Sequence, residues 1–287
     1  MEKCEIVLTS DAGSRGRRRV LQLGKEFAGH PSGWKRKGEV VFGVLSRLTA
    51  KAGLTGRHPG RGSPIIVLGM HRSGTSFLTG SLQLAGLALG QHSVSDRYNQ
   101  KGNRENAGFV GFHNDVLAQR ANAWDNPPAE TIVWTEAERL RAQSLVASFD
   151  ATTLWGFKDP RTLLMMDEWQ LMCPQAAYIG IFRNPVAVVR SLVGRRDILA
   201  DKATALWVDY NQRLLDFHKK KPFALLCFDE DEPTLHTKIN RIFPKMGLSA
   251  IASDRFFRQD LKHHTQESDV IPPDLARLYA ELQARKW

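Results

Sequence analysis

The segment from Ile65 to Ser76 constrains the fold of this chain more than any other. A short, β-branched apolar run, Ile65-Ile66-Val67-Leu68, ends at Gly69, and a helical pattern follows from about Gly74 to Gly86. A strand that turns through a glycine-bearing loop into a helix presents free backbone N–H groups and the positive end of the helix dipole. The sequence therefore predicts an anion-binding loop at the end of a buried strand.

The rest of the chain alternates short apolar runs with helical patterns, which favours an α/β fold with a central parallel sheet and helices on its faces. Further strands are expected at Leu154–Phe157, Ala177–Phe182 and Phe223–Phe228. Helices are expected at Thr135–Phe149, Val186–Val193, Ala200–His218, Thr234–Phe243 and Pro273–Arg285. In open α/β sheets ligands bind at the carboxyl ends of the strands. We therefore expect the site where these strands end.

The positive charge of the protein is concentrated at its N-terminus. The first 62 residues carry 13 Lys and Arg against 5 acidic residues, which accounts for most of the net charge of +10. We predict a partly helical basic extension and linker over residues 1–62 and one domain over residues 63–287. The extension is either a solvated tail or an arm for an anionic membrane, an acidic glycan or a nucleic acid. Of these partners, we expect the membrane or glycan and no nucleic acid.

Cysteine usage and hydropathy point to a cytoplasmic protein. Cys4, Cys173 and Cys227 are odd in number and lack redox or metal-ligand spacing. The N-terminus lacks the long apolar stretch of a secretory signal, and no window approaches the roughly 18 apolar residues needed to cross a bilayer. We expect a cytoplasmic location, with peripheral membrane contact through the basic segment left open.

The loop matches the P-loop pattern G-x-x-x-x-G-K-[ST] except at its lysine. Gly69, Gly74 and Ser76 stand at the expected positions, but Thr75 occupies the lysine position. That lysine reaches the terminal phosphates of a nucleoside triphosphate, so its absence argues against ATP or GTP hydrolysis. A cation stands inside the loop instead, at Arg72.

The loop Gly69-Met70-His71-Arg72-Ser73-Gly74-Thr75-Ser76 resembles the 5′-phosphosulfate loop of sulfotransferases that use 3′-phosphoadenosine 5′-phosphosulfate (PAPS). A second signature of that family is an Arg at a strand end followed eight residues later by a Ser, and Arg183 and Ser191 match it. The resemblance covers about Ser63 to His264. It implies a P-loop-like three-layer α/β domain, with PAPS as co-substrate and no metal. The implied donor ligands are His71, Arg72, Ser73, Gly74, Thr75 and Ser76, with Arg183 and Ser191 on the 3′-phosphate.

The resemblance also suggests the residues that carry the chemistry. Lys158-Asp159-Pro160 is similar to a motif of tyrosylprotein and many bacterial sulfotransferases, and it implies that Lys158 touches the transferring group, with Arg72 as the other cation. The alternative for Lys158 is a surface network with its neighbours. Glu105 is our first choice for the base, and His113 is the second. The stretch before Glu105 has Asn103 and Arg104 where relatives carry aromatic residues, so an ordinary loop carboxylate is an equal alternative.

The resemblance to bacterial members of this family implies an acceptor hydroxyl on a saccharide or glycolipid, and a small phenol or a peptide tyrosine is the next choice. Two other classes of function remain: a P-loop nucleotide kinase or NTPase, and a catalytically lapsed nucleotide-binding protein with a basic interaction arm. Asp229-Glu230 and His263-His264 are taken as structural or peripheral, and no metal site is predicted.

Overall fold

The computed structural model describes residues 5–8, 19–22, 62–92, 102–196, 198–252 and 270–287. The chain divides into two units, residues 1–53 and 54–287. The described part of the first unit is an antiparallel pair of strands, β1 (Glu5–Leu8) and β2 (Arg19–Gln22). The rest of the predicted extension, including its expected helical parts, lies outside the described residues. The predicted boundary between residues 62 and 63 stays a prediction.

The second unit is built on a four-stranded parallel sheet, which confirms the predicted fold class. The strands lie in the order β4 (Gly156–Lys158), β3 (Ile65–Leu68), β5 (Ala177–Phe182) and β6 (Ala224–Cys227). Because all four are parallel, their carboxyl ends meet at one edge of the sheet. Arg72, Lys158 and Arg183 lie at or just after the carboxyl ends of β3, β4 and β5. Ser191 lies in the helix that follows β5, and Glu105 lies two residues before the helix that begins at Ala107.

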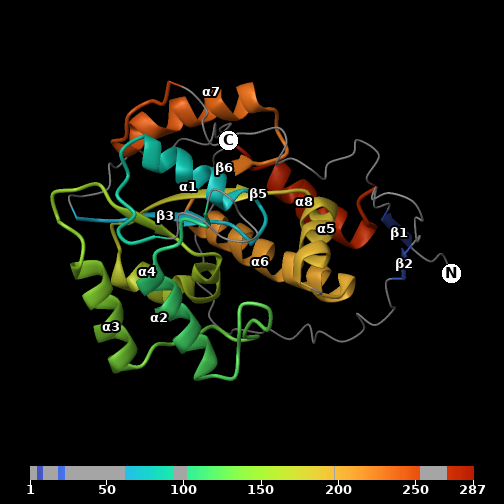
Figure 1. Ribbon diagram of the computed structural model, residues 1–287, viewed down its shortest axis with the longest axis horizontal. Coiled ribbons are helices and arrows are strands. Elements are labelled where there is room, and N and C mark those ends of the chain that lie inside the picture. Colours follow the sequence, from blue (N-terminus) through green and yellow to red (C-terminus); the bar gives the residue numbers. More distant parts are fainter. Residues whose placement is uncertain (1–4, 9–18, 23–61, 93–101, 197, 253–269) are drawn as a thin grey trace, which may run out of the picture. The chain divides into compact units, whose positions relative to one another are not determined.

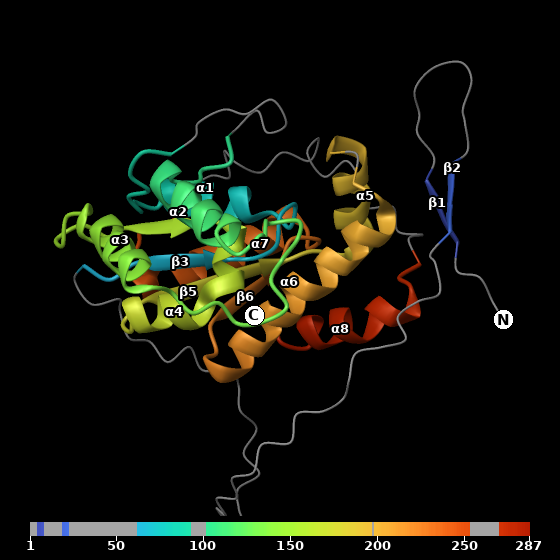
Figure 2. The same ribbon diagram turned by 90° about the horizontal axis from the view of Figure 1, so that it is seen from below.

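Helices cover both faces of the sheet, as predicted (Figure 1). One face packs against α1 (Thr75–Leu84) and α7 (Glu232–Ile242), and alternate strand residues such as Val67, Ile181 and Leu226 join that core. The opposite face packs against α6 (Ala200–Lys220), where Phe217 meets Tyr178. Helices α5 (Pro185–Arg196) and α8 (Pro273–Gln283) both pack against α6, and α8 lies beside it in Figure 2.

An aromatic cluster fills the space beside the edge strand β4. Its members are Phe109, Phe112, Trp134, Trp155, Phe157 and Trp169. Phe109 and Phe112 lie in α2 (Ala107–Ala118), Trp169 lies in α4 (Met166–Met172), and Phe157 lies in β4 directly after Trp155 and Gly156. Trp134 lies just before α3 (Glu136–Ala147), and the 3-10 helix η1 (Pro160–Met165) joins β4 to α4. Burial of these rings outweighs the low helix propensity of the two glycines in α2, which the sequence pattern did not reveal as a helix.

No helix within the described ranges is long and apolar enough to cross a membrane.

Candidate active site

The loop between β3 and α1 depends on two glycines. A Cβ on Gly69 would collide with the carbonyl oxygen of Ile181, and a Cβ on Gly74 would collide with the ring of Phe228. Gly74 also has a φ of 88°, a left-handed conformation that glycine adopts without strain. The loop can therefore lie close against the neighbouring strands only with these residues at these two positions.

The loop contains one fully buried hydroxyl, that of Ser73. Its Oγ has no hydrogen-bond partner among the described residues. The N-terminus of α1 has no side-chain cap in the described part of the chain. Ser76 Oγ donates to the carbonyl of Asn103 at 3.2 Å. A buried hydroxyl and an uncapped helix N-terminus at one loop suit a bound anion.

The second predicted phosphate signature lies directly against this loop. Arg72, which has a φ of 67°, donates from Nε to Ser191 Oγ at 3.0 Å. Arg183 donates from Nη1 to the carbonyl of Arg72 at 3.4 Å. The structure thus brings together three residues that are up to 119 positions apart in the sequence. The Arg72 side chain is directed toward Ser191, so it has to rotate before it can serve a group bound along the loop.

Asp229, which the sequence interpretation took as structural or peripheral, contacts Arg183, and that contact was not predicted. Its carboxylate lies 3.7 Å from Nε of Arg183 and accepts from the backbone N–H of Asn184 at 2.6 Å. The guanidinium also lies 5.2 Å from the ring centre of Phe228. The apolar runs before Arg183 and Asp229 could have indicated this contact, because both residues follow the ends of strands that pair in parallel.

Lys158 and Glu105 form a largely buried ion pair at the end of β4. Lys158 Nζ lies 2.7 Å from Glu105 Oε1, and only 2% of the lysine and 16% of the glutamate side chain are exposed. This position argues against the surface network that was the alternative for Lys158. A carboxylate beside a buried cation is chemically suited to accept a proton while the cation stabilises negative charge.

His113, the second choice for the base, is fully buried, and both of its ring nitrogens are engaged. Trp169 Nε1 donates to Nε2 at 2.9 Å, and an indole N–H can only donate. Nε2 therefore accepts, and Nδ1–H donates to Asp159 Oδ2 at 2.9 Å. This arrangement disfavours His113 as the base and leaves Glu105 as the candidate.

Asp159 is the buried centre of this network. Its other oxygen accepts from Arg161 Nη1 at 2.7 Å. Burial by itself would raise the pKa of Asp159, but the interactions with His113 and Arg161 outweigh burial and hold that pKa below its ordinary value. The carboxylate is therefore ionised across the neutral range.

His71, a predicted donor ligand, lies in an aromatic setting. Its ring centre is 4.7 Å from that of Trp124 and 5.9 Å from that of Tyr210. The Tyr210 hydroxyl in turn donates to the Trp124 carbonyl at 2.8 Å. These contacts hold the His71 ring against α6 and away from solvent on that side.

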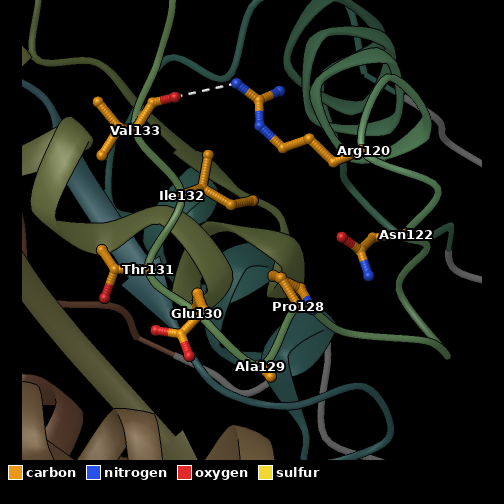
Figure 3. A pocket seen from close by; sticks show the side chains of 8 residues that line it. All are labelled: Arg120, Asn122, Pro128, Ala129, Glu130, Thr131, Ile132 and Val133. Atoms are coloured by element: carbon orange, nitrogen blue, oxygen red, sulfur yellow. Dashed lines mark hydrogen bonds between the residues drawn. The ribbon is translucent and has the colours of Figure 1, made fainter.

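Two cavities lie among the described residues, one beside Glu105 and one beside Arg120. A cavity of about 610 Å³ reaches Glu105, and its lining residues are Gln91, His92, Glu105, Ala107 and Val110. A smaller one of about 280 Å³ lies around Arg120, which donates to the carbonyl of Val133 at 2.9 Å (Figure 3). The guanidinium of Arg120 is already held by both oxygens of Glu138. The cavity beside Glu105 is therefore the better candidate for a substrate.

Within the described residues, no group of three or more His, Cys, Asp or Glu side chains is arranged to hold a metal ion. His263 and His264 lie outside the described residues.

Comparisons with known proteins give a limited result. No protein-family model matches the sequence, and no curated protein matches it significantly. Among solved structures, the chain is similar to the sulfotransferase domain of the Synechococcus PCC 7002 olefin synthase, at 17% identity and a TM-score of 0.46 over 79% of this chain and 97% of that one. It is also similar to a Mycobacterium avium sulfotransferase, at 15% identity and a TM-score of 0.47 over 79% of this chain and 76% of that one. A third similar structure is a sulfotransferase from Alicyclobacillus acidocaldarius, at 17% identity and a TM-score of 0.42 over 77% of this chain and 94% of that one. At these levels the function has to be argued from the site.

Proposed function

We propose that this protein is a PAPS-dependent sulfotransferase that transfers a sulfuryl group to an acceptor hydroxyl. The observation that carries the proposal is the convergence of Arg72, Ser191 and Arg183. Arg72 Nε lies 3.0 Å from Ser191 Oγ, and Arg183 Nη1 lies 3.4 Å from the Arg72 carbonyl. Two cations and a hydroxyl beside a glycine loop suit a ligand with two separate phosphate groups.

The loop residues fit such a donor. Glycines at positions 69 and 74 keep the backbone free of side chains that would collide with neighbouring strands, and the buried Ser73 hydroxyl has a hydrogen bond to give. The lysine that would reach a γ-phosphate is replaced by Thr75, which is buried. The donor supplies an activated sulfuryl group on a phosphate, and no metal ligand set is needed if Arg72 and Lys158 provide the positive charge.

The residues of the site divide the reaction between them. Glu105 accepts the proton of the acceptor hydroxyl as that oxygen bonds to sulfur. The bond from sulfur to the phosphate oxygen breaks, and 3′-phosphoadenosine 5′-phosphate (PAP) leaves with the electron pair. Lys158 Nζ, 2.7 Å from Glu105, stabilises negative charge at the transferring group and releases the carboxylate as it does so. Arg72 leaves Ser191 to bind the 5′-phosphate.

The acceptor enters from the cavity beside Glu105. A volume of about 610 Å³ accommodates one or two sugar rings. Its lining combines the polar side chains of Gln91 and His92 with the apolar Ala107 and Val110. This mixture suits the hydroxyls and the apolar ring face of a saccharide or glycolipid headgroup.

Isothermal titration calorimetry with PAP tests the donor assignment. The wild-type protein should bind PAP without Mg²⁺, and Arg183→Ala should weaken binding about 30-fold, because a charge-assisted hydrogen bond to a phosphate is lost. Arg213→Gln is the matched control. Arg213 is a partly buried arginine that holds Asp209 at 3.0 Å on α6 outside the site, and its replacement should leave PAP binding unchanged.

The same protein, incubated with labelled PAPS and a panel of saccharides, glycolipids, phenols and tyrosine peptides, reports transfer. Failure of the wild type to bind PAP would contradict the proposal. Mg²⁺-dependent ATP turnover would instead favour the kinase or NTPase class. PAP binding without transfer to any acceptor and without PAPS hydrolysis would indicate a lapsed nucleotide-binding protein.

For the basic first 62 residues we propose contact with an anionic membrane or acidic glycan, in a cytoplasmic protein. The support is their excess of Lys and Arg over acidic residues. Deletion of residues 1–53, the first unit, should abolish salt-sensitive binding to vesicles that contain phosphatidylserine, while leaving PAP affinity unchanged.

A further inference from the structure

A buried chain of hydrogen bonds ends at Arg161, a residue that the mechanism above does not use. Trp169 donates to His113, and His113 donates to Asp159, each at 2.9 Å. Asp159 Oδ1 then accepts from Arg161 twice, from Nη1 at 2.7 Å and from the backbone N–H at 3.0 Å. Asp159 therefore holds Arg161 both at one guanidinium nitrogen and at its backbone N–H.

This network does more than fold stability requires. Burying a carboxylate and a guanidinium is expensive in free energy, and apolar side chains of similar volume would stabilise such a core at least as well. A guanidinium also has five N–H donors. The Nε atom of Arg161 is buried and has no hydrogen-bond partner among the described residues. The network therefore orients a cation whose donors are only partly used.

Arg161 follows Lys158, the cation of the Lys158–Glu105 pair, by three residues. Its positive charge interacts with the carboxylates of Asp159 and Glu105, and Tyr210 is among its electrostatic neighbours. The Tyr210 ring packs against His71 in the donor loop. Burial alone would lower the pKa of Arg161, but the charges of Asp159 and Glu105 outweigh burial and raise that pKa, so the guanidinium stays cationic.

We propose that Arg161 is a further catalytic residue, which donates a hydrogen bond to an oxygen of the sulfuryl group as that group moves to the acceptor. Asp159, His113 and Trp169 are the residues that position it. The inference rests on the proposed sulfotransferase activity. A donor that is already oriented costs no reorganisation when charge develops on the sulfuryl oxygens, which is the condition for a large effect on rate.

Arg161→Gln tests this role through turnover and binding together. With labelled PAPS, kcat should fall about 100-fold, as when one preorganised donor is lost. The KM for PAPS and the Kd for PAP should stay within about threefold, since PAP lacks the sulfuryl group. Inorganic sulfate, added to the PAP-loaded protein as a probe of the sulfuryl position, should bind about tenfold more weakly by calorimetry.

Arg161→Lys keeps a charge near Asp159 and serves as the second variant where Arg161→Gln folds poorly. It should retain PAP binding and lose turnover, because an ammonium cannot hold Asp159 and reach the sulfuryl group at once. Arg213→Gln is again the matched control and should keep wild-type kcat.

The inference is overturned if both Arg161 variants keep kcat within threefold of the wild type. It is also overturned if sulfate binds them as it binds the wild type, or if PAP affinity falls in parallel with kcat, which would indicate a structural role alone. In each of these cases a wild type that binds PAP and turns over PAPS leaves the proposed function standing. A wild type that does not bind PAP overturns both.

Discussion

The donor loop and the Lys158–Glu105 region lie at the same edge of the sheet but are built on different principles. The conformation of the loop from Gly69 to Ser76 depends on backbone geometry, because a Cβ at either of its two glycines would collide with a neighbouring group. The other region is a set of opposite charges, with Lys158 on Glu105 and Asp159 on Arg161, buried beside the aromatic cluster. We therefore expect the loop to be disrupted by substitutions that add a side chain at a glycine. The charged region should instead lose stability or activity when one of its charges is removed.

The largest effect is expected from Glu105→Gln. Loss of the general base should lower kcat about 1,000-fold, while the Kd for PAP stays within about twofold. Steady-state turnover of labelled PAPS and calorimetry with PAP measure the two quantities. Glu130→Gln, an exposed glutamate at the smaller cavity, is the matched control and should keep wild-type turnover. Unchanged turnover in Glu105→Gln would move the base elsewhere.

Asp159→Asn should produce the next largest effect, on stability. Removing one charge of a buried network leaves Arg161 uncompensated, and we expect the free energy of unfolding to fall by about 3 kcal/mol in urea titrations. Asp115→Asn breaks a pair with Arg141 in which both side chains are about half exposed. That control should change stability by less than about 1 kcal/mol. Equal losses in the two variants would contradict a special role for burial.

The difference in the free energy of unfolding between the wild type and Asp159→Asn should depend on pH in a direction that the pKa of Asp159 fixes. Because the pKa of Asp159 is lowered in the folded protein, the unfolded chain binds more protons as pH falls. The stabilisation is therefore complete above the ordinary aspartate pKa of about 4 and is lost below it. Urea unfolding at pH 7, 5 and 3 should show the gap between wild type and Asp159→Asn narrowing at pH 3. A gap that widens there would be evidence against the ionised network.

Gly74→Ala should break the loop region by adding a single methyl group. The new Cβ would collide with the Phe228 ring and would have to occupy a left-handed backbone conformation. We expect a loss of about 2 kcal/mol in stability and about tenfold in PAP affinity. Gly194→Ala in α5 is the control, because a Cβ there meets nothing within 4 Å and should stabilise the helix slightly. Equal changes in stability and PAP affinity in the two variants would contradict the requirement for glycine at position 74.

Ser191→Ala is expected to have the smallest effect. It removes one hydroxyl from the donor site and releases Arg72 from its 3.0 Å contact. These consequences oppose each other, so PAP affinity should fall only about fivefold. Calorimetry beside Ser144→Ala, an exposed serine of α3, measures the difference. A loss as large as that for Arg183→Ala would mean that the hydroxyl carries as much of the phosphate contact as the arginine.

Much of the fold followed from local patterns. The strands around Val67, Ile179 and Leu225 were predicted within a few residues, because short apolar runs between glycines and prolines have few alternatives. Helix α2 was not predicted, since its glycines and aromatic residues favour a helix only once the rings of Phe109 and Phe112 are buried. The site residues themselves remain predictions to be tested by the variants above.

The amino-acid sequence by itself determined the turn from β3 through Gly69 and Gly74 into α1, because a strand, two glycines and a helix start within twelve residues leave little conformational choice. It also supplied the candidates Arg183, Ser191 and Lys158 through their order along the chain. Only the tertiary structure decided that Lys158 meets Glu105 across 53 positions, that His113 is enclosed by Asp159 and Trp169, and that Arg161 is left with donors to spare. Such pairings depend on burial and on which side chains the packed sheet brings together, and no local pattern records them.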